Sequence, residues 1–125
     1  MNTNELTYEI RAAAFAVHTE LGPGLLESAY EQCLVHELQM RGFSAISQVR
    51  IPLTYRGIVL GDGYRADIIV ENQVLLELKA VKELEPVHHA QVLAYLRLSG
   101  LTVGLLMNFN VHRMRDGIKR FIQDT

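Results

Sequence analysis

The spacing of apolar residues changes from a helical to a strand period near Gly42, and this change constrains the fold more than any other feature. Before Gly42, apolar residues recur every three or four positions in two segments, about residues 4–20 and 25–41. Gly22-Pro23-Gly24 separates the two segments and predicts a break between two helices. After Gly42, apolar and polar residues alternate from Ala45 to Tyr55, which is typical of a strand with one buried face. The chain therefore combines helices with a sheet.

The middle of the chain predicts a meander of three strands. The first strand runs from Ala45 to Tyr55 and continues through residues 58–60, and Pro52 places part of it at a sheet edge. Asp62-Gly63 is a strong signal for a two-residue hairpin turn, so residues 64–70 are expected to form the second strand. Residues 71–73 then lead into a third strand over residues 74–80.

The last part predicts a helix followed by one or two strands. Pro86 stands at the favoured first position of a helix that runs to about Ser99 and stops at Gly100. Residues 103–109 are nearly all apolar, as in a buried central strand, and we expect residues 117–122 to form a last strand. This order predicts an α/β (α+β) fold, in which helices flank a mixed sheet built from an antiparallel meander and a crossover helix.

Composition narrows the class of protein. A length of 125 residues predicts one domain, residues 1–125. The net charge of -2 is a poor electrostatic match for a dedicated nucleic-acid binder, and we interpret the basic residues between Arg113 and Arg120 as solvated surface in preference to a phosphate-facing patch. The single cysteine, Cys33, is expected to be a reduced core thiol. No signal peptide or membrane span is visible, so a cytoplasmic location is expected.

Two acids and a lysine stand in strands that are otherwise apolar. Glu77 and Lys79 occur in the segment VLLELKA, and Asp67 lies in the preceding strand. Alternation places Glu77 and Lys79 on the face of Leu75, and it places Asp67 on the face of Arg65 and Ile69. The remaining residues of the third strand then face the core: Val74, Leu76, Leu78 and Ala80.

The loop between these strands decides whether the two carboxylates meet. A three-residue loop pairs Val70 with Val74 and so sets Asp67 opposite Glu77, with Cβ atoms about 4.5–5.5 Å apart. A two-residue loop would put them on opposite faces. Like charges this close raise each other's pKa, and a divalent cation such as Mg²⁺ or Mn²⁺ would compensate. The alternative is an ordinary ion pair, Glu77 with Lys79 or Asp67 with Arg65, on a solvated face.

Two helices offer further polar residues. In the helix after Pro86, the spacing puts His88, Gln91 and Tyr95 on one side, away from the apolar Val87, Ala90, Ala94 and Leu98. This side could face the carboxylates or be an ordinary polar surface. In the segment GLLESAY, Glu27 and Tyr30 lie on one helical side, and a first-turn glutamate is also explained by the helix dipole alone.

These residues together resemble a known family. The pattern Gly24-x-x-Glu27-x-x-Tyr30 is similar to the signature of the small bacterial GxxExxY proteins, which are placed in the PD-(D/E)XK nuclease superfamily. Asp67 matches the motif aspartate, and Glu77-Leu78-Lys79 matches (D/E)-x-K. Gln91 matches a helical glutamine of several branches, whereas Ala66 replaces the proline that names the superfamily.

The resemblance implies a restriction-endonuclease-like core and a site with assigned roles. It implies Mg²⁺, or Mn²⁺, bound by Asp67 and Glu77 together with Glu27 and the backbone carbonyl of Leu78. Lys79 would position or activate the water that attacks a phosphodiester, with Gln91 as a further catalytic residue. We expect Tyr30, His88 and Tyr95 at the edge of the site.

Three functions are consistent with these residues. The first is an Mg²⁺-dependent nuclease or phosphodiesterase that acts on nucleic acid. The second is a catalytically silent module that keeps the nuclease-like fold and binds nucleic acid or protein. The third, hydrolysis of a small phosphoester, lacks a phosphate-binding glycine loop of the P-loop type. A nuclease this small has little surface for a duplex, so a homodimer or a partner protein would help it.

Overall fold

The structure is a computed structural model that describes residues 1–123, except for the side chains of Asp62 and Gly63. The described residues form three α-helices, five strands and one short 3₁₀ turn. The helices are α1 (Thr3–Leu21), α2 (Glu27–Met40) and α3 (Pro86–Ser99). The strands and the 3₁₀ turn are β1 (Ala45–Tyr55), β2 (Ile58–Val70), β3 (Val74–Lys79), β4 (Val103–Asn108), η1 (Met114–Asp116) and β5 (Ile118–Ile122).

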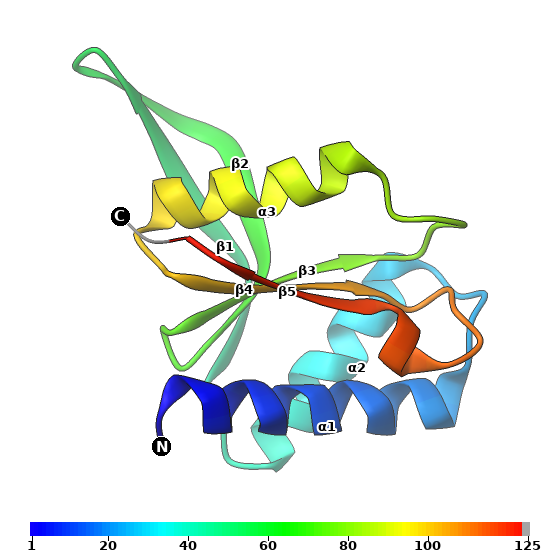
Figure 1. Ribbon diagram of the computed structural model, residues 1–125. Helices are drawn as coiled ribbons and strands as arrows, with labels where there is room; N and C mark the ends of the chain where they lie inside the picture. Colours follow the sequence, from blue (N-terminus) through cyan, green and yellow to red (C-terminus); the bar gives the residue numbers. More distant parts are fainter. Residues whose placement is uncertain (124–125) are drawn as a thin grey trace.

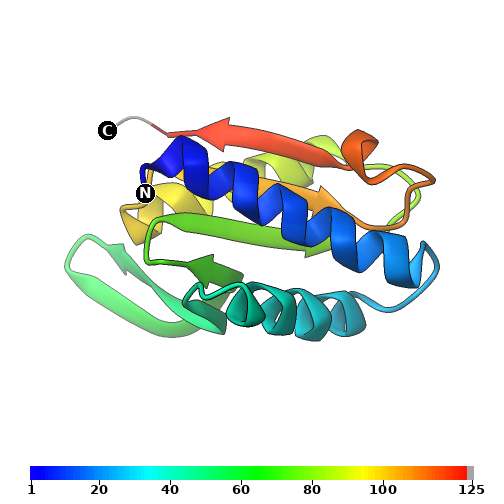
Figure 2. The same ribbon diagram turned by 90° about the horizontal axis from the view of Figure 1, so that it is seen from below.

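The strands form one mixed sheet in the order β1-β2-β3-β4-β5. The β1, β2 and β3 strands pair antiparallel, β3 pairs parallel with β4, and β5 is antiparallel to β4. Helix α3 makes the crossover that two parallel neighbours require, and it covers one face of the sheet (Figure 1). Helices α1 and α2 lie side by side across the other face (Figure 2). The predicted α+β fold, with its meander, crossover helix and last strand, is confirmed.

Each face of the sheet has its own apolar core. Val74, Leu76 and Leu78 of β3 pack with α1 and α2, whereas Leu75 packs with Val92 and Leu96 of α3. The predicted division of β3 into two faces is therefore confirmed. Within the described residues, no helix has both the length and the apolar character needed to cross a membrane.

The predicted hairpin turn at Asp62-Gly63 is wrong. Strand β1 pairs with β2 from Ala45↔Val70 to Tyr55↔Ile58, so the turn is Arg56-Gly57, with φ of 47° and 85°. A two-residue turn with two positive φ angles matches the twist of the flanking strands. The register shifts between Ile51 and Leu53, where Pro52 cannot donate to the ladder, and this irregularity absorbs the additional residues of β2. The hairpin therefore becomes one long arm that projects beyond the sheet (Figure 1).

The prediction for Cys33 is wrong, and Tyr95, predicted on the side of α3 away from its apolar residues, is buried. The core side of α3 includes Val92, Tyr95 and Leu96, and Ala94 and Leu98 pack against it, whereas Val87 is 67% exposed. Cys33 is exposed on α2 and is not a core thiol. In both helices, several apolar or small residues stand on more than one side, so periodicity alone did not identify the side that packs on the sheet.

Close packing of α3 on β4 generates a stability prediction. A Cβ at Gly104 would lie 2.9 Å from Val92 Cγ1 and 3.3 Å from Leu96 Cδ1. We expect Gly104→Ala to lower the free energy of unfolding by about 1–3 kcal/mol, because α3 must shift to admit the methyl group. Denaturant unfolding measures this loss, with the exposed Thr102→Ala as the control. An unchanged stability in Gly104→Ala would contradict close packing at this point.

Candidate functional site

The candidate site lies where β2 and β3 separate. Their ladder pairs Val70 with Val74 and ends at Ile68↔Leu76, so the register predicted from a three-residue loop is confirmed. At the next position, hydrogen bonds from backbone N–H groups to side-chain carboxylates replace the backbone ladder. The Asp67 N–H donates to Glu77 Oε1 at 3.2 Å, and the Leu78 N–H donates to Asp67 Oδ2 at 2.8 Å. Each carboxylate is therefore held by a backbone N–H group at this fork.

At the same point, the regular alternation of β2 side chains between the two faces of the sheet is interrupted. Ala66 and Ile68 are two residues apart, yet Ala66 packs on the α3 side and Ile68 on the α1 and α2 side. Arg65 and Ile69 therefore lie on opposite faces of the sheet, so the prediction that Asp67 shares one face with both of them is wrong. The partner strand changes as well: Gln48 has a φ of 54°, outside the strand region. This double reversal lets Asp67 turn toward β3.

Glu77 is a buried acid next to a second acid. Its exposed fraction is 2%, and it lies on the Leu75 face of β3, toward α3. Burial, and next the Asp67 carboxylate, raise the pKa of Glu77 to about 9, although the charge of Lys79 acts in the opposite direction. Among residues 1–123, no salt bridge joins Glu77 to Lys79 or Asp67 to Arg65, so the ion-pair alternative is not what the structure contains.

Lys79 is the last residue of β3 and is half-buried. Its carbonyl accepts a hydrogen bond from the Phe109 N–H at 2.9 Å, which joins the end of β3 to the loop after β4. Its position two residues after Glu77 puts its ammonium group on the same side of the strand, close enough to affect the pKa of Glu77.

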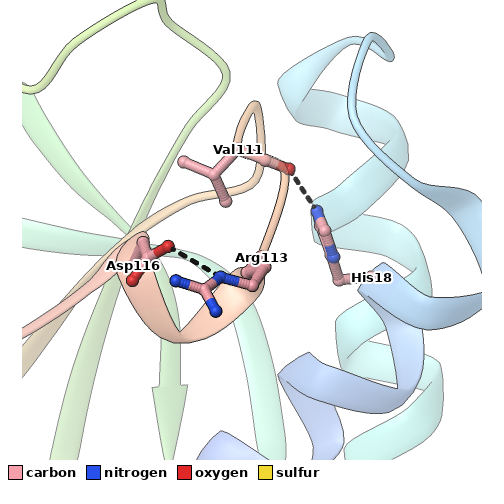
Figure 3. A network of polar contacts seen from close by, with 4 residues as sticks. All are labelled: His18, Val111, Arg113 and Asp116. Carbon is pink, nitrogen blue, oxygen red and sulfur yellow. Dashed lines mark hydrogen bonds and ion pairs between the residues drawn. The ribbon is translucent and has the colours of Figure 1, made fainter.

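The loop between β4 and β5 is anchored at this end of the sheet. His18 Nε2 of α1 donates to the Val111 carbonyl at 2.8 Å, and Arg113 pairs with Asp116 at 3.4 Å (Figure 3). The four basic side chains of the segment are exposed, and Arg120 donates to Asn4. Exposure fits both a solvated surface and a patch that faces phosphate, so the preference for a solvated surface at Arg113, Arg115, Lys119 and Arg120 stays a prediction.

Helix α3 brings an amide and a phenol toward the carboxylates. Gln91 Nε2 donates to the Tyr95 hydroxyl at 3.1 Å. Burial raises the pKa of Tyr95, and the charges of Glu77 and Asp67 raise it further, which places Tyr95 within electrostatic reach of both acids. His88 has another role, since its Nδ1 accepts from the Glu85 N–H at 2.9 Å and so caps α3.

The two signature residues of α2 have different surroundings. Glu27 is exposed at the first position of the helix. Tyr30 is fully buried: its hydroxyl donates to the Gly22 carbonyl at 2.6 Å and accepts from the Leu25 N–H at 3.1 Å. Its ring stacks on Phe109 with 4.7 Å between centroids. Tyr30 therefore holds the loop that leads into α2 and joins it to the loop after β4.

Glu31 is an acidic residue that the sequence analysis missed. Gln48 Nε2 donates to both of its carboxylate oxygens, at 2.9 and 3.1 Å. Burial raises the pKa of Glu31, the Gln48 bond lowers it, and the Asp67 and Glu27 carboxylates raise it. Glu31 is thus within electrostatic reach of Asp67. Its position four residues after Glu27, on the same side of a helix, was the available signal.

Two side chains of the site, those of Asp67 and Glu77, are suited to bind a divalent cation. In the part of the chain that the structure describes, no three His, Cys, Asp or Glu side chains come together as a metal-binding group. Asp67 and Glu77 do meet, and a buried acid beside another acid, without a salt bridge, is a site that a cation would stabilise. Mg²⁺ is often held by one or two carboxylates, with water completing its octahedron.

The chain is similar to known proteins in family and in fold. A family model described as the PD-(D/E)XK nuclease superfamily matches residues 4–121. No protein of curated function matches the chain. Among solved structures, the crystal structure of SSO0001 is similar, with a TM-score of 0.59 and 22% sequence identity. That match covers 78% of this chain and 50% of SSO0001, so this chain corresponds to about half of that protein's length and the likeness is one of fold.

The burial of Glu77 generates a prediction about stability and pH. With a chelator present, we expect the free energy of unfolding to fall as pH rises between 4.5 and about 9, the unfolded and folded pKa values of Glu77. A raised folded pKa means that the folded state favours neutral Glu77, so its stabilisation is complete below the lower value and is lost as pH rises through the upper one. The slope from this group approaches about 1.4 kcal/mol per pH unit.

Denaturant unfolding of the wild type and of Glu77→Gln, at several pH values across this window, measures the slope. The variant is expected to lose most of the pH dependence in the window, because its amide does not titrate. The exposed Glu83→Gln is the matched control and should keep the wild-type profile. Parallel profiles for the wild type and Glu77→Gln would show that Glu77 is not the buried titrating acid.

Proposed function

Because the chain belongs to the PD-(D/E)XK nuclease superfamily, we propose that it is a divalent-metal-dependent nuclease that hydrolyses phosphodiester bonds in nucleic acid. The observation that carries the proposal is the fork of β2 and β3, where the Asp67 N–H donates to buried Glu77 and the Asp67 carboxylate accepts from the Leu78 N–H. Lys79 follows Glu77 on the same side of β3, so the three residues meet at one end of the sheet.

The roles of the residues follow from their chemistry. Asp67 and Glu77 would hold Mg²⁺ or Mn²⁺, with the Leu78 carbonyl as an additional candidate ligand. When bound, such a cation would supply a water of lowered pKa and charge to offset that of the phosphate. The Lys79 ammonium would orient the attacking water or stabilise the negative charge that develops on the phosphate. Gln91 and Tyr95 would donate hydrogen bonds from α3 at the edge of the site.

A second candidate function is a non-catalytic module that keeps the nuclease fold and binds nucleic acid or protein. Two observations favour it: within the described residues, the exposed Glu27 forms no three-residue metal group with Asp67 and Glu77, and the net charge of -2 suits a protein partner better than nucleic acid. The buried Asp67–Glu77 pair favours the nuclease, since a binding module has no need for a buried acid of raised pKa.

We expect Lys79→Ala to reduce cleavage about 10²- to 10³-fold, because one charged group that acts on the developing phosphate charge is removed. The measurement is cleavage of labelled single-stranded and duplex DNA and RNA with Mg²⁺ or Mn²⁺, and with a chelator. Lys82→Ala, an exposed lysine just beyond β3, is the matched control and should cleave like the wild type. Full cleavage by Lys79→Ala would contradict the proposed role, and no cleavage of any substrate by the wild type would support the binding module.

Metal binding can be tested separately from cleavage. We expect Asp67→Asn to abolish Mn²⁺ binding in calorimetry, and Glu31→Gln to weaken it about tenfold, since Glu31 adds negative charge close to Asp67. Glu37→Gln, on the same helix but paired with Arg41 at 2.8 Å, is the control and should bind like the wild type. Equal Mn²⁺ affinity in Glu31→Gln and Glu37→Gln would remove Glu31 from the site.

A further inference from the structure

An open groove of about 600 Å³ lies between α3 and the β1–β2 arm. Its lining is mostly apolar and includes Leu53 and Tyr64 of the arm together with Val87, Tyr95 and Leu98 of α3. We call it the α3 groove. Tyr95 belongs both to this groove and to the surroundings of Glu77 and Asp67, so the groove begins at the candidate site.

The α3 groove exposes an apolar side of α3 that the core covers only in part. Val87, Ala90, Ala94 and Leu98 all line the groove, and Val87 is 67% exposed. Ala94 and Leu98 also pack against the core around Val92 and Leu96, whereas Val87 and Ala90 are exposed. An apolar strip that is open to solvent beside a candidate site marks a surface that binds an apolar or aromatic group.

One aromatic ring in the groove is exposed and held in place. Tyr64 is 41% exposed, and its ring meets the edge of Tyr95 at 61°, with 5.8 Å between centroids. Tyr95 is itself fixed by the hydrogen bond from Gln91. Tyr64 is also only three residues before Asp67 on β2. A ring held this near the carboxylates can stack on a base that neighbours the reacting phosphate.

The charge of the groove suits a nucleic acid. Among the described residues, those that line it include Arg97, exposed in the last turn of α3, and none of them is a carboxylate. A cation at the rim of an aromatic groove matches a base attached to an anionic backbone. In a duplex the bases are stacked on one another and paired, so their faces cannot enter the groove, whereas an unpaired base can.

We propose that the α3 groove binds an unpaired nucleobase next to the phosphodiester that is cleaved, so that the substrate is single-stranded or locally unpaired nucleic acid. This inference rests on the proposed nuclease function. Tyr64 is the stacking platform, Tyr95 sets its orientation, and Arg97 faces the backbone of the strand. Tyr64 is thus a specificity-determining residue and takes no part in bond cleavage.

Binding measured without cleavage tests the groove apart from catalysis. The probes are a fluorescein-labelled oligothymidine and a duplex of equal length and mixed sequence, titrated with the Lys79→Ala protein in Ca²⁺ and followed by anisotropy. We expect the single strand to bind more tightly than the duplex. Adding Tyr64→Leu should weaken single-strand binding at least about fivefold, because base stacking on the ring is lost, and should leave duplex binding unchanged.

Two control variants separate stacking from folding. Tyr64→Phe keeps the ring and should retain single-strand binding. Tyr8→Leu removes a 71% exposed tyrosine from α1, on the opposite side of the sheet, and should have no effect. Because the chain has no tryptophan, quenching of tyrosine fluorescence by the bound strand provides a second readout that Tyr64→Leu should reduce.

Four outcomes would overturn the inference. Equal affinity for duplex and single strand would do so, as would single-strand binding that Tyr64→Leu leaves unchanged. A wild-type dimer in sedimentation that Tyr64→Leu dissociates would instead assign the groove to self-association. Cleavage of duplex at the same rate as single strand would reject the groove proposal and keep the nuclease. Tyr64-dependent binding of a strand that the wild type never cleaves would keep the groove and reject the nuclease.

Discussion

The site depends on two hydrogen bonds that join Asp67 of β2 to Glu77 and Leu78 of β3. Where the β2–β3 ladder ends, two backbone N–H groups would otherwise lack partners, and a carboxylate oxygen accepts from each. The same contacts bring two acids together in a place where one of them, Glu77, is 2% exposed. The same carboxylate oxygens therefore satisfy the backbone N–H groups of the diverging strands and form a pair of acids that suits a cation.

The fork also joins the two sides of the molecule. Glu77 faces α3, where Gln91 and Tyr95 lie, whereas Asp67 is within electrostatic reach of Glu31 on α2, across the sheet. One face of the sheet alone could not supply both the α3 residues and Glu31 of α2. They meet because β2 reverses its faces at Asp67 while Gln48, at a positive φ, does so on β1 and then binds Glu31.

Tyr30 of the signature contributes to the architecture of the site. Tyr30 ties the loop after α1 to the start of α2 and stacks on Phe109, whose N–H binds the Lys79 carbonyl. This chain of contacts connects the tyrosine of the signature with the lysine of the site. It gives a physical reason for a tyrosine at this position: the ring fills the core, and the hydroxyl satisfies two backbone groups of a tight loop.

Much of the fold was available from the sequence because periodicity records burial directly. The change of period near Gly42, the pattern of VLLELKA and the helix start at Pro86 predicted the helices, the mixed sheet and the two faces of β3. The three-residue loop was enough to set Val70 opposite Val74 and so to place Asp67 and Glu77 close together. These features are local in the chain, or they follow from counting residues around one turn.

What only the tertiary structure decided is non-local. The turn at Arg56-Gly57 depends on the pairing of two long strands around Pro52, which outweighs the local preference of Asp62-Gly63. The side of α3 that is buried depends on the shape of the sheet beneath it, so Val87 faces an open groove while Val92 packs inside. The reversal at Asp67 and the place of Glu31 beside it require a left-handed backbone at Gln48, a conformation that the packing of β1 against β2 and α2 imposes and residue type alone does not reveal.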